Sequence, residues 1–129
     1  MTHTETARTG SGSTLQWLRL ASLASLLALL WQFATAGQLV TGNDVLVLHA
    51  IGAGALHVTT ALTLVAAVLH WRRDRSARGV LVWAAVVFVL TFVQAWLGGA
   101  GNLAAHVPGA LVLTVGVVWL PIWALRAPR

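Results

Sequence analysis

The chain has no cysteine and no lysine, and it carries only three acidic residues among 129. Without cysteine, a disulfide, a thiolate metal ligand and a thiol nucleophile are all excluded. The three acids, Glu5, Asp44 and Asp74, lie at or beyond the ends of the apolar runs. A carboxylate-based proton pump is therefore not expected, and most zinc sites are disfavoured because they need cysteine or carboxylate ligands beside histidine.

Charge of either sign is scarce: 9% of the residues are charged, whereas 58% are hydrophobic. A soluble domain carries roughly 25% charged residues, and a chain this apolar would expose large hydrophobic patches to water. The composition predicts an integral membrane protein whose main partner is the lipid bilayer. The net charge of +5 comes from eight arginines, but they flank apolar runs and form no stripe, so nucleic acid is not expected as a partner.

Four apolar runs are each about 20 residues long, the length that crosses a hydrocarbon core of roughly 30 Å. Lipid offers backbone groups no hydrogen-bond partner, so such runs must be helical, and short connections make consecutive helices antiparallel neighbours. The predicted fold is all-α: a four-helix transmembrane bundle, up-down-up-down, over residues 15–126, behind a disordered cytoplasmic tail at 1–14. The expected spans are residues 15–36, 45–71, 80–97 and 103–125.

Arginine placement predicts the orientation of the bundle. All eight arginines fall on one side of the four spans, and the positive-inside rule makes that side the cytoplasm. Both termini are then cytoplasmic, and the protein is expected in a bacterial plasma membrane as a multi-pass protein. The alternative is that residues 1–36 form a signal peptide cleaved after Ala34-Thr35-Ala36, but its apolar run exceeds the usual 7–15 residues.

Two histidines stand out because they lie at matching depths. His49 is about five residues into the second span and His106 about three residues into the fourth, both counted from the ends that lack arginine. The second and fourth helices of such a bundle are diagonal, with axes roughly 11–14 Å apart. That gap is too wide for a direct bond but accommodates a metal-bearing plate between two imidazoles, and histidine is a standard axial ligand of haem iron.

Small residues surround the same depth: Gly52 follows His49, and Gly109 follows His106. This clearance suits a flat macrocycle, although small residues also let membrane helices pack closely without any cofactor. Gln94, near the end of the third span, is expected to face the cavity. The sequence thus predicts haem b with His49 and His106 as iron ligands and with Gln94, Gly52 and Gly109 beside it. In the absence of a basic residue on this side, polar side chains would hold the haem propionates: Gln38, Thr41, Asn43, Gln94 and Asn102.

The other polar residues within the spans have plainer interpretations. His57 lies about 12 Å deeper than His49, without a histidine partner at its level, and is expected to form a hydrogen bond between helices. His70 is expected to anchor its helix in the solvated interface. Pro108 is expected in the first turn of the fourth helix, where its missing N–H costs nothing. The remaining candidates for interhelical hydrogen bonds are Gln32, Thr59, Thr60, Thr63 and Gln94.

Three short motifs carry a family resemblance: Leu48-His49-Ala50, Gln94–Gly98 and Ala105-His106. Across residues 15–126 the chain resembles one four-helix half of haem A synthase, the membrane enzyme that oxidises a haem methyl group for cytochrome oxidase. Other small four-helix b-type membrane cytochromes share the same kind of arrangement, with histidines on the helices of a membrane bundle. The resemblance implies an iron-ligand role for His49 and His106, because each bundle of that family carries one such histidine on its second helix and one on its fourth.

The chain departs from that family at three points. Leu46 stands where the catalytic bundle has a glutamate, one helical turn before the second-helix histidine. The first outer loop, residues 37–44, lacks the cysteine pair of many members, and the second bundle of the tandem is missing. These departures favour a bundle that holds a cofactor without oxidation chemistry, so the chain is not expected to be an enzyme.

Three functions stay open from the sequence. The first is haem holding or electron transfer by a bundle with bis-histidine ligation. The second is a structural or accessory membrane subunit without a cofactor, in which the histidines only pack. The third is a half-length enzyme similar to haem A synthase that supplies two bundles as a homodimer. A homodimer or a larger membrane complex is accordingly expected.

Overall fold

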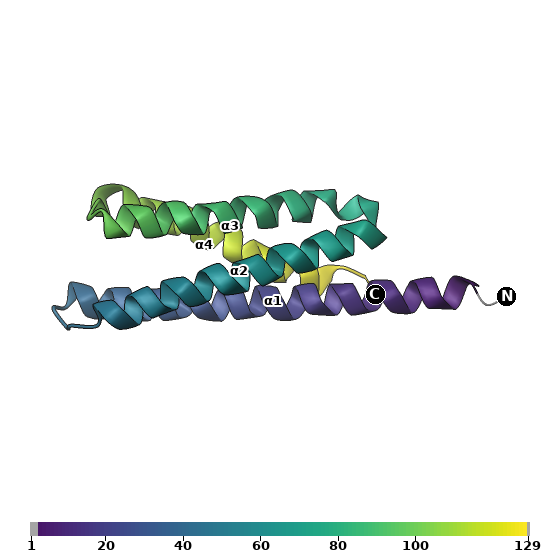
Figure 1. The fold of residues 1–129 in the computed structure, drawn as a ribbon, viewed down its shortest axis with the longest axis horizontal. Helices are drawn as coiled ribbons and strands as arrows, with labels where there is room; N and C mark the ends of the chain where they lie inside the picture. The colour runs from purple at the N-terminus through teal and green to yellow at the C-terminus, as the bar shows by residue number, and fades with distance from the viewer. Residues whose placement is uncertain (1–2, 129) are drawn as a thin grey trace.

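The computed structural model describes residues 3–128, with side chains from residue 12 onward, and this part of the chain is helical with no strand. The helical elements in chain order are α1 (His3–Val40), α2 (Leu46–Arg73), the short 3-10 helix η1 (Arg75–Ala77), α3 (Arg78–Gly99) and α4 (Leu103–Arg126). Figure 1 labels the long helices. All four long helices are long and apolar enough to cross a membrane. The prediction of an all-α protein with four membrane-spanning helices is confirmed.

Helix α1 is longer at both ends than the span predicted at 15–36. It ends at Val40 and begins at His3, so it also runs through most of the segment predicted as a disordered tail at 1–14. That prediction and the helix differ over residues 3–14, while residues 1–2 lie outside the described part. Among the described side chains of α1, from residue 12 onward, the first buried ones are Thr14 and Leu15. The N-terminal end of the helix projects beyond the other three (Figure 1).

The connections between helices are short and contain specific stop and start signals. Gly42 and Gly101 adopt positive φ angles of 87° and 72°, which glycine accepts without the steric cost of a Cβ. The Asn102 side chain accepts a hydrogen bond from the Ala105 N–H at 3.2 Å and caps α4. Asp74 accepts from the backbone and the hydroxyl of Ser76, and these bonds lower the pKa of Asp74.

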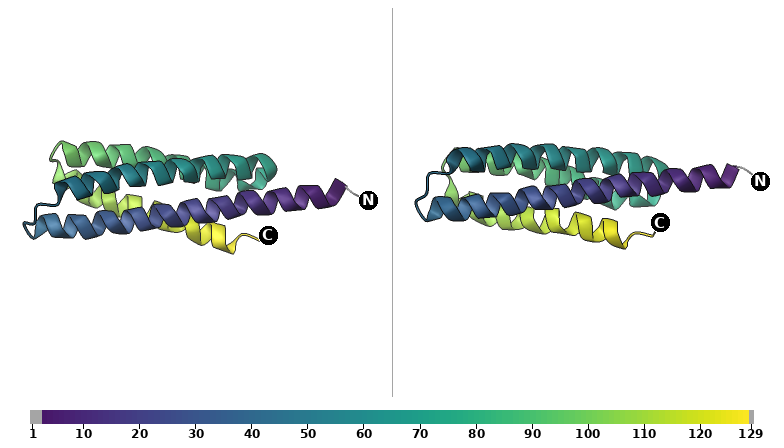
Figure 2. Two further views of the ribbon diagram at one scale, coloured as in Figure 1. Left: turned by 60° about the horizontal axis from the view of Figure 1, so that its bottom comes forward. Right: turned by 90° about the horizontal axis from the view of Figure 1, so that it is seen from below.

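The four long helices form a closed ring. Each packs on its two neighbours, in the order α1, α2, α3, α4 and back to α1, whereas the diagonal pairs α1/α3 and α2/α4 do not pack directly within the described residues. Figure 2 shows the same arrangement from two further sides. We call the end with residues 41–45 and 100–102 the histidine end, and the end with residues 74–77 the arginine end.

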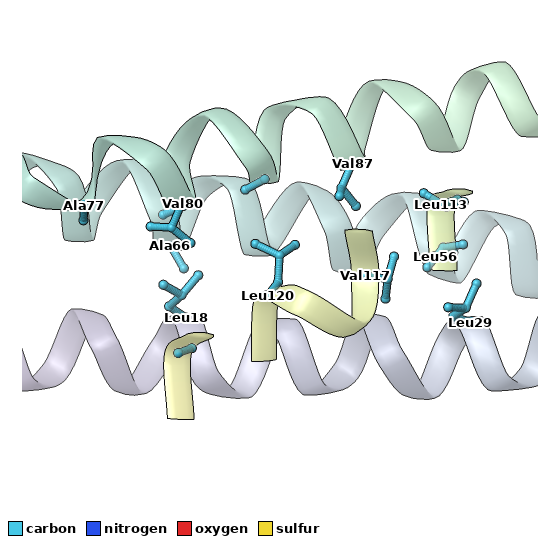
Figure 3. Close-up of a cluster of buried hydrophobic side chains, with 13 residues drawn as sticks. Leu18, Leu29, Leu56, Ala66, Ala77, Val80, Val87, Leu113, Val117 and Leu120 are labelled. Carbon is cyan, nitrogen blue, oxygen red and sulfur yellow. The ribbon is translucent and has the colours of Figure 1, made fainter. Parts of the chain in front are cut away.

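The solid part of the core fills the bundle from the arginine end to about its middle. Leu18, Val80, Val117 and Leu120 are each at most 2% exposed, and they cluster with small residues such as Ala66 (Figure 3). The cluster ends towards the histidine end at Leu29, Leu56 and Leu113. Small and β-branched side chains let the helix backbones approach closely, as expected for packing in lipid.

Apolar side chains also cover the outer surface of the bundle. Leu27, Val58, Val89 and Val115 are all more than half exposed, and every helix contributes others. In water, such a surface would be a large hydrophobic patch. In hydrocarbon it requires no cover, which agrees with the four membrane-spanning helices.

Polar groups tie α1 to its neighbours at several levels. The Arg19 guanidinium donates to the backbone oxygens of Ala124 at 2.8 Å and Ala127 at 2.9 Å, so it satisfies carbonyls that the end of α4 leaves without helical partners. Near the middle, Ser25 and Thr63 share a hydrogen bond of 3.1 Å between α1 and α2. This contact confirms the interhelical role predicted for Thr63.

Other expectations for polar residues and proline were wrong. Thr59 and Thr60 donate to carbonyls of their own helix, because an i−4 carbonyl is always within reach of a threonine hydroxyl in a helix.

Pro108 lies inside α4 and outside its first turn, because the Asn102 cap starts the helix at Leu103. Because proline has no backbone N–H, α4 lacks one helical hydrogen bond at Pro108, near the histidine end.

Candidate functional site

A cavity of about 430 Å³ occupies the histidine end of the bundle, above the solid core. Leu29, Leu56 and Leu113, the last members of the core cluster, form part of its wall. All four long helices contribute to the lining, which is mostly leucine, alanine and glycine and contains no charged arginine, aspartate or glutamate among the described residues. The polar lining residues are Gln32, His49, His57, Thr91, Gln94 and His106.

His49 is held by a threonine on the neighbouring helix. Its Nδ1 lies 2.8 Å from the Thr35 hydroxyl, and that hydroxyl is also within reach of the backbone carbonyls of Trp31 and Gln32 in α1. When the single hydroxyl proton is directed at one of these carbonyls, Thr35 accepts a hydrogen bond from the His49 Nδ1–H. In that tautomer Nε2 is the unprotonated nitrogen, the form in which imidazole binds a metal.

His106 reaches the same state through a different partner. Its Nδ1 lies 3.0 Å from the backbone oxygen of Gln94 on α3, and a carbonyl can only accept, so Nδ1 carries the proton. The ring lies against Gly98, where an added Cβ would come within 3.1 Å of the His106 Cε1 atom.

His57 is the third imidazole of the cavity wall, a position that the sequence did not lead us to expect. Its Nδ1 donates to the Ala53 oxygen at 2.6 Å, within its own helix. Its ring stands edge-on to Phe92 of α3, with centroids 4.3 Å apart. The predicted hydrogen bond between helices is therefore wrong for His57, because the nearer i−4 carbonyl takes the proton and α3 offers an aromatic ring.

Gln94 lines the cavity, as the sequence predicted, and is only 8% exposed. Its Oε1 atom is buried and has no hydrogen-bond partner, whereas its backbone oxygen holds His106. The side-chain amide packs against Gly109, where an added Cβ would collide with the Gln94 Nε2 atom. Gln94 therefore brings an unsatisfied acceptor to the site, and its side chain makes no hydrogen bond to another helix among the described residues.

The two glycines predicted to border a cofactor have packing roles. Gly52 faces α1, where an added Cβ would collide with the side chains of Trp31 and Gln32. Those side chains cross to α2 and donate to the carbonyls of Leu48 at 3.0 Å and His49 at 2.9 Å. Neither Gly52 nor Gly109 is among the cavity-lining residues. A polar side chain packs directly against each glycine, Gln32 against Gly52 and Gln94 against Gly109.

The Gln32 contact confirms the interhelical role predicted for that residue, and it fixes the first turn of α2 next to His49. The roles of Thr35 and Trp31 were not predicted from the sequence. The available signal was the position of Thr35 near the end of the first span, at the depth of His49. Apolar runs alone do not show which side of a helix faces a neighbour, so the pairing could not be deduced.

His70 lies far from this cavity and differs from its prediction. It is only 4% exposed, its Nδ1 lies 3.3 Å from the Thr14 hydroxyl, and its ring is edge-on to Trp123 at 6.1 Å. The prediction of a solvated anchor is wrong, because α1 and α4 extend far enough to cover this turn of α2.

The described residues contain no group of three histidine, cysteine or acidic side chains placed to hold a metal ion by themselves. The site consists instead of separate imidazoles on α2 and α4 around an apolar cavity. No protein-family model, curated protein or solved structure matches the chain.

Proposed function

We propose that this protein is a membrane-spanning haem-binding bundle in which His49 and His106 hold the iron of haem b through their Nε2 atoms. One observation carries the proposal: two imidazoles from different helices line one cavity, and the Nδ1 atom of each lies within hydrogen-bond distance of a protein oxygen. Metal-ligating histidines characteristically donate their second ring N–H in this way, which fixes the tautomer and the ring orientation.

The cavity supports a haem by its size and chemistry. Its volume of about 430 Å³ lies in the range of ligand pockets, which is roughly 300–1,000 Å³. The lining is apolar around the histidines, as a porphyrin ring requires, and the buried Gln94 Oε1 still lacks a donor. Polar side chains for the propionates stand at the same end, where Asn43 donates to Gln38 at 2.6 Å and to Thr41 at 3.3 Å.

When bound, haem supplies reversible one-electron exchange. The residues of the chain then have separate tasks: His49 and His106 bind the iron, Thr35 and the Gln94 carbonyl orient the two rings, and the leucines keep water away. Leu46 also lines the cavity, at the position where the resembling enzyme family has a glutamate. A wall without a carboxylate favours haem holding or electron transfer over haem oxidation.

The orientation of the bundle is part of the proposal. We propose an up-down-up-down course with both termini in the cytoplasm of a bacterium, since both ends of the chain lie towards the arginine end (Figure 1). Cysteines introduced singly at Thr41 and Ser76 test this. An impermeant thiol reagent applied to whole cells should label the first and spare the second. The reverse pattern would contradict the orientation, and loss of residues 1–36 from the mature chain would favour the signal-peptide alternative.

A homodimer stays part of the proposal as the expected assembly, because the resembling family uses two bundles in tandem. Mass measurement in several mild detergents, corrected for bound detergent, tests it. A monomer in every detergent would remove the basis for a homodimeric enzyme but would leave a haem-binding monomer intact.

The decisive experiment is a visible spectrum of the purified protein, expressed with ample haem. We expect a Soret band and the sharp reduced bands of six-coordinate low-spin iron, with one unmodified haem b recovered on extraction. Purified protein without Soret absorption would overturn haem binding and leave the structural or accessory subunit. Recovery of a haem with an oxidised substituent would instead support the enzyme related to haem A synthase.

A further inference from the structure

The strongest concentration of charge lies at the opposite end from the cavity. Four arginines fall within seven residues around the connection between α2 and α3, and all four side chains are exposed. We call Arg72, Arg73, Arg75 and Arg78 the arginine cluster. It has no part in the haem site, so a ligand bound there would be independent of the proposed function.

Acidic side chains do not neutralise the cluster. Asp74 is the only acid in this segment, and its carboxylate accepts two hydrogen bonds from Ser76, at 2.9 Å from the backbone N–H and 2.6 Å from the hydroxyl. The lowered pKa of Asp74 keeps it ionised. The segment therefore has four positive charges and one negative charge, and the negative Asp74 carboxylate is already hydrogen-bonded to Ser76. The net positive charge of this surface attracts anions.

An aromatic ring sets the height of the cluster relative to the membrane. The Arg75 guanidinium carbon lies 4.2 Å from the centroid of the Trp71 ring, a cation–π contact. Tryptophan concentrates at the level of lipid headgroups, and stacking on its face leaves the edge of the guanidinium available. That edge presents paired N–H donors whose geometry matches a phosphate.

We propose that the arginine cluster is a binding site for the headgroup of an anionic phospholipid. A phosphate diester at the membrane surface combines the required charge with the required height, and basic segments next to a membrane helix are attracted to anionic lipid by about fivefold in affinity per arginine. The bound lipid would also shield the four like charges from one another.

The test uses the full-length protein in a neutral detergent, so that removal of arginines cannot alter membrane insertion during the measurement. A fluorescent short-chain phosphatidylglycerol is the probe, and the matching phosphatidylcholine is its control. The quadruple variant R72Q/R73Q/R75Q/R78Q should bind phosphatidylglycerol more than about 100-fold more weakly than wild type. Arg126→Gln, an exposed arginine near the end of α4, is the matched control and should change binding less than about threefold.

Further arms separate a lipid site from simpler explanations. The quadruple lysine variant keeps the charge but loses the paired guanidinium donors, so it should bind more weakly than wild type and more tightly than the glutamine variant. Far-UV circular dichroism of the glutamine variant should match that of wild type, so that its loss of binding is not a loss of fold. Equal binding of phosphatidylcholine, unchanged binding by the glutamine variant, or an equal loss in Arg126→Gln would each overturn the proposal. Displacement of the lipid by equimolar inorganic phosphate would also overturn it, since the site would then belong to a soluble anion.

Discussion

The two halves of the bundle are built from similar apolar helices but differ in what lies between them. Towards the arginine end, Val80, Ala84 and Leu120 close the centre almost completely. Towards the histidine end, the same four helices surround a cavity of about 430 Å³ whose polar side chains are histidine, glutamine and one threonine. The buried contacts that hold the four helices together are thus concentrated in the first half, and the space that could take a ligand lies in the second half. A bundle that was solid throughout would have no site, and one that was hollow throughout would lack the contacts that hold its helices together.

Removing one of the two proposed iron ligands from the hollow half should have the largest effect. His49→Ala and His106→Ala should each abolish the low-spin spectrum or convert it to high-spin, because six-coordinate iron needs both imidazoles. His57→Ala is the control from the same cavity and should leave the low-spin bands in place, since its ring packs on Phe92. Loss of the low-spin bands in His57→Ala, with retention in His106→Ala, would reassign the ligand pair.

In the solid half, Arg19→Gln should destabilise the bundle strongly. The guanidinium donates to two carbonyls at the end of α4, and hydrogen bonds from a charged group are each worth about 1.5–3 kcal/mol. For the two bonds together, we expect the free energy of unfolding to fall by about 1.5–3 kcal/mol in denaturant titrations of the purified protein. Arg126→Gln removes the same charge from an exposed position and should cost less than about 0.5 kcal/mol. Equal losses in both variants would show that charge, and not the contact with α4, is responsible.

Adding volume to each half should sharpen the contrast. Ala84→Leu inserts three carbon atoms where the side chain is 1% exposed, and overpacking of this kind costs about 1–3 kcal/mol. Ala110→Leu makes the same change on the cavity wall and should cost less than about 1 kcal/mol in the haem-free protein, because space is available. A cost at Ala110 as large as that at Ala84 would mean that the cavity is closed in solution.

The smallest effect is expected from Thr35→Val, which removes the acceptor of the His49 Nδ1–H but keeps the side-chain shape. The hydrogen bond is worth about 0.5–1.5 kcal/mol, and its loss makes His49 a weaker electron donor to iron. The midpoint potential of the haem should therefore rise, as measured by spectroelectrochemical titration. Thr35→Ser keeps a hydroxyl and should restore the wild-type potential, whereas an unchanged potential in Thr35→Val would remove Thr35 from the site.

The sequence predicted the four helices well because length and hydropathy determine what can cross lipid. It also brought His49, His106 and Gln94 to one cavity, since depth along a helix can be counted from the ends of a span. It failed where the direction of a side chain mattered, as for the burial of His70 and the cavity position of His57. These helices are apolar on all sides, so no polar face marks the side that turns inward.

Details that depend on atomic proximity were out of reach for the same reason. Gly52 was assigned to a cofactor because it follows His49, yet it faces Trp31 and Gln32 across the α1/α2 contact. The role of Thr35 depends on which hydrogen bonds its hydroxyl already makes. Neither fact is encoded in spacing, because both depend on how two helices are rotated about their own axes.

The solid core below the cavity also governs permeability. Leu18, Val117 and Leu120 are at most 1% exposed and lie across the axis of the bundle (Figure 3), so the cavity is a blind pocket. Water or ions that enter from the histidine end meet close-packed carbon before the opposite membrane face. A bundle with this arrangement holds polar side chains between membrane-length helices without a continuous polar path from one end to the other.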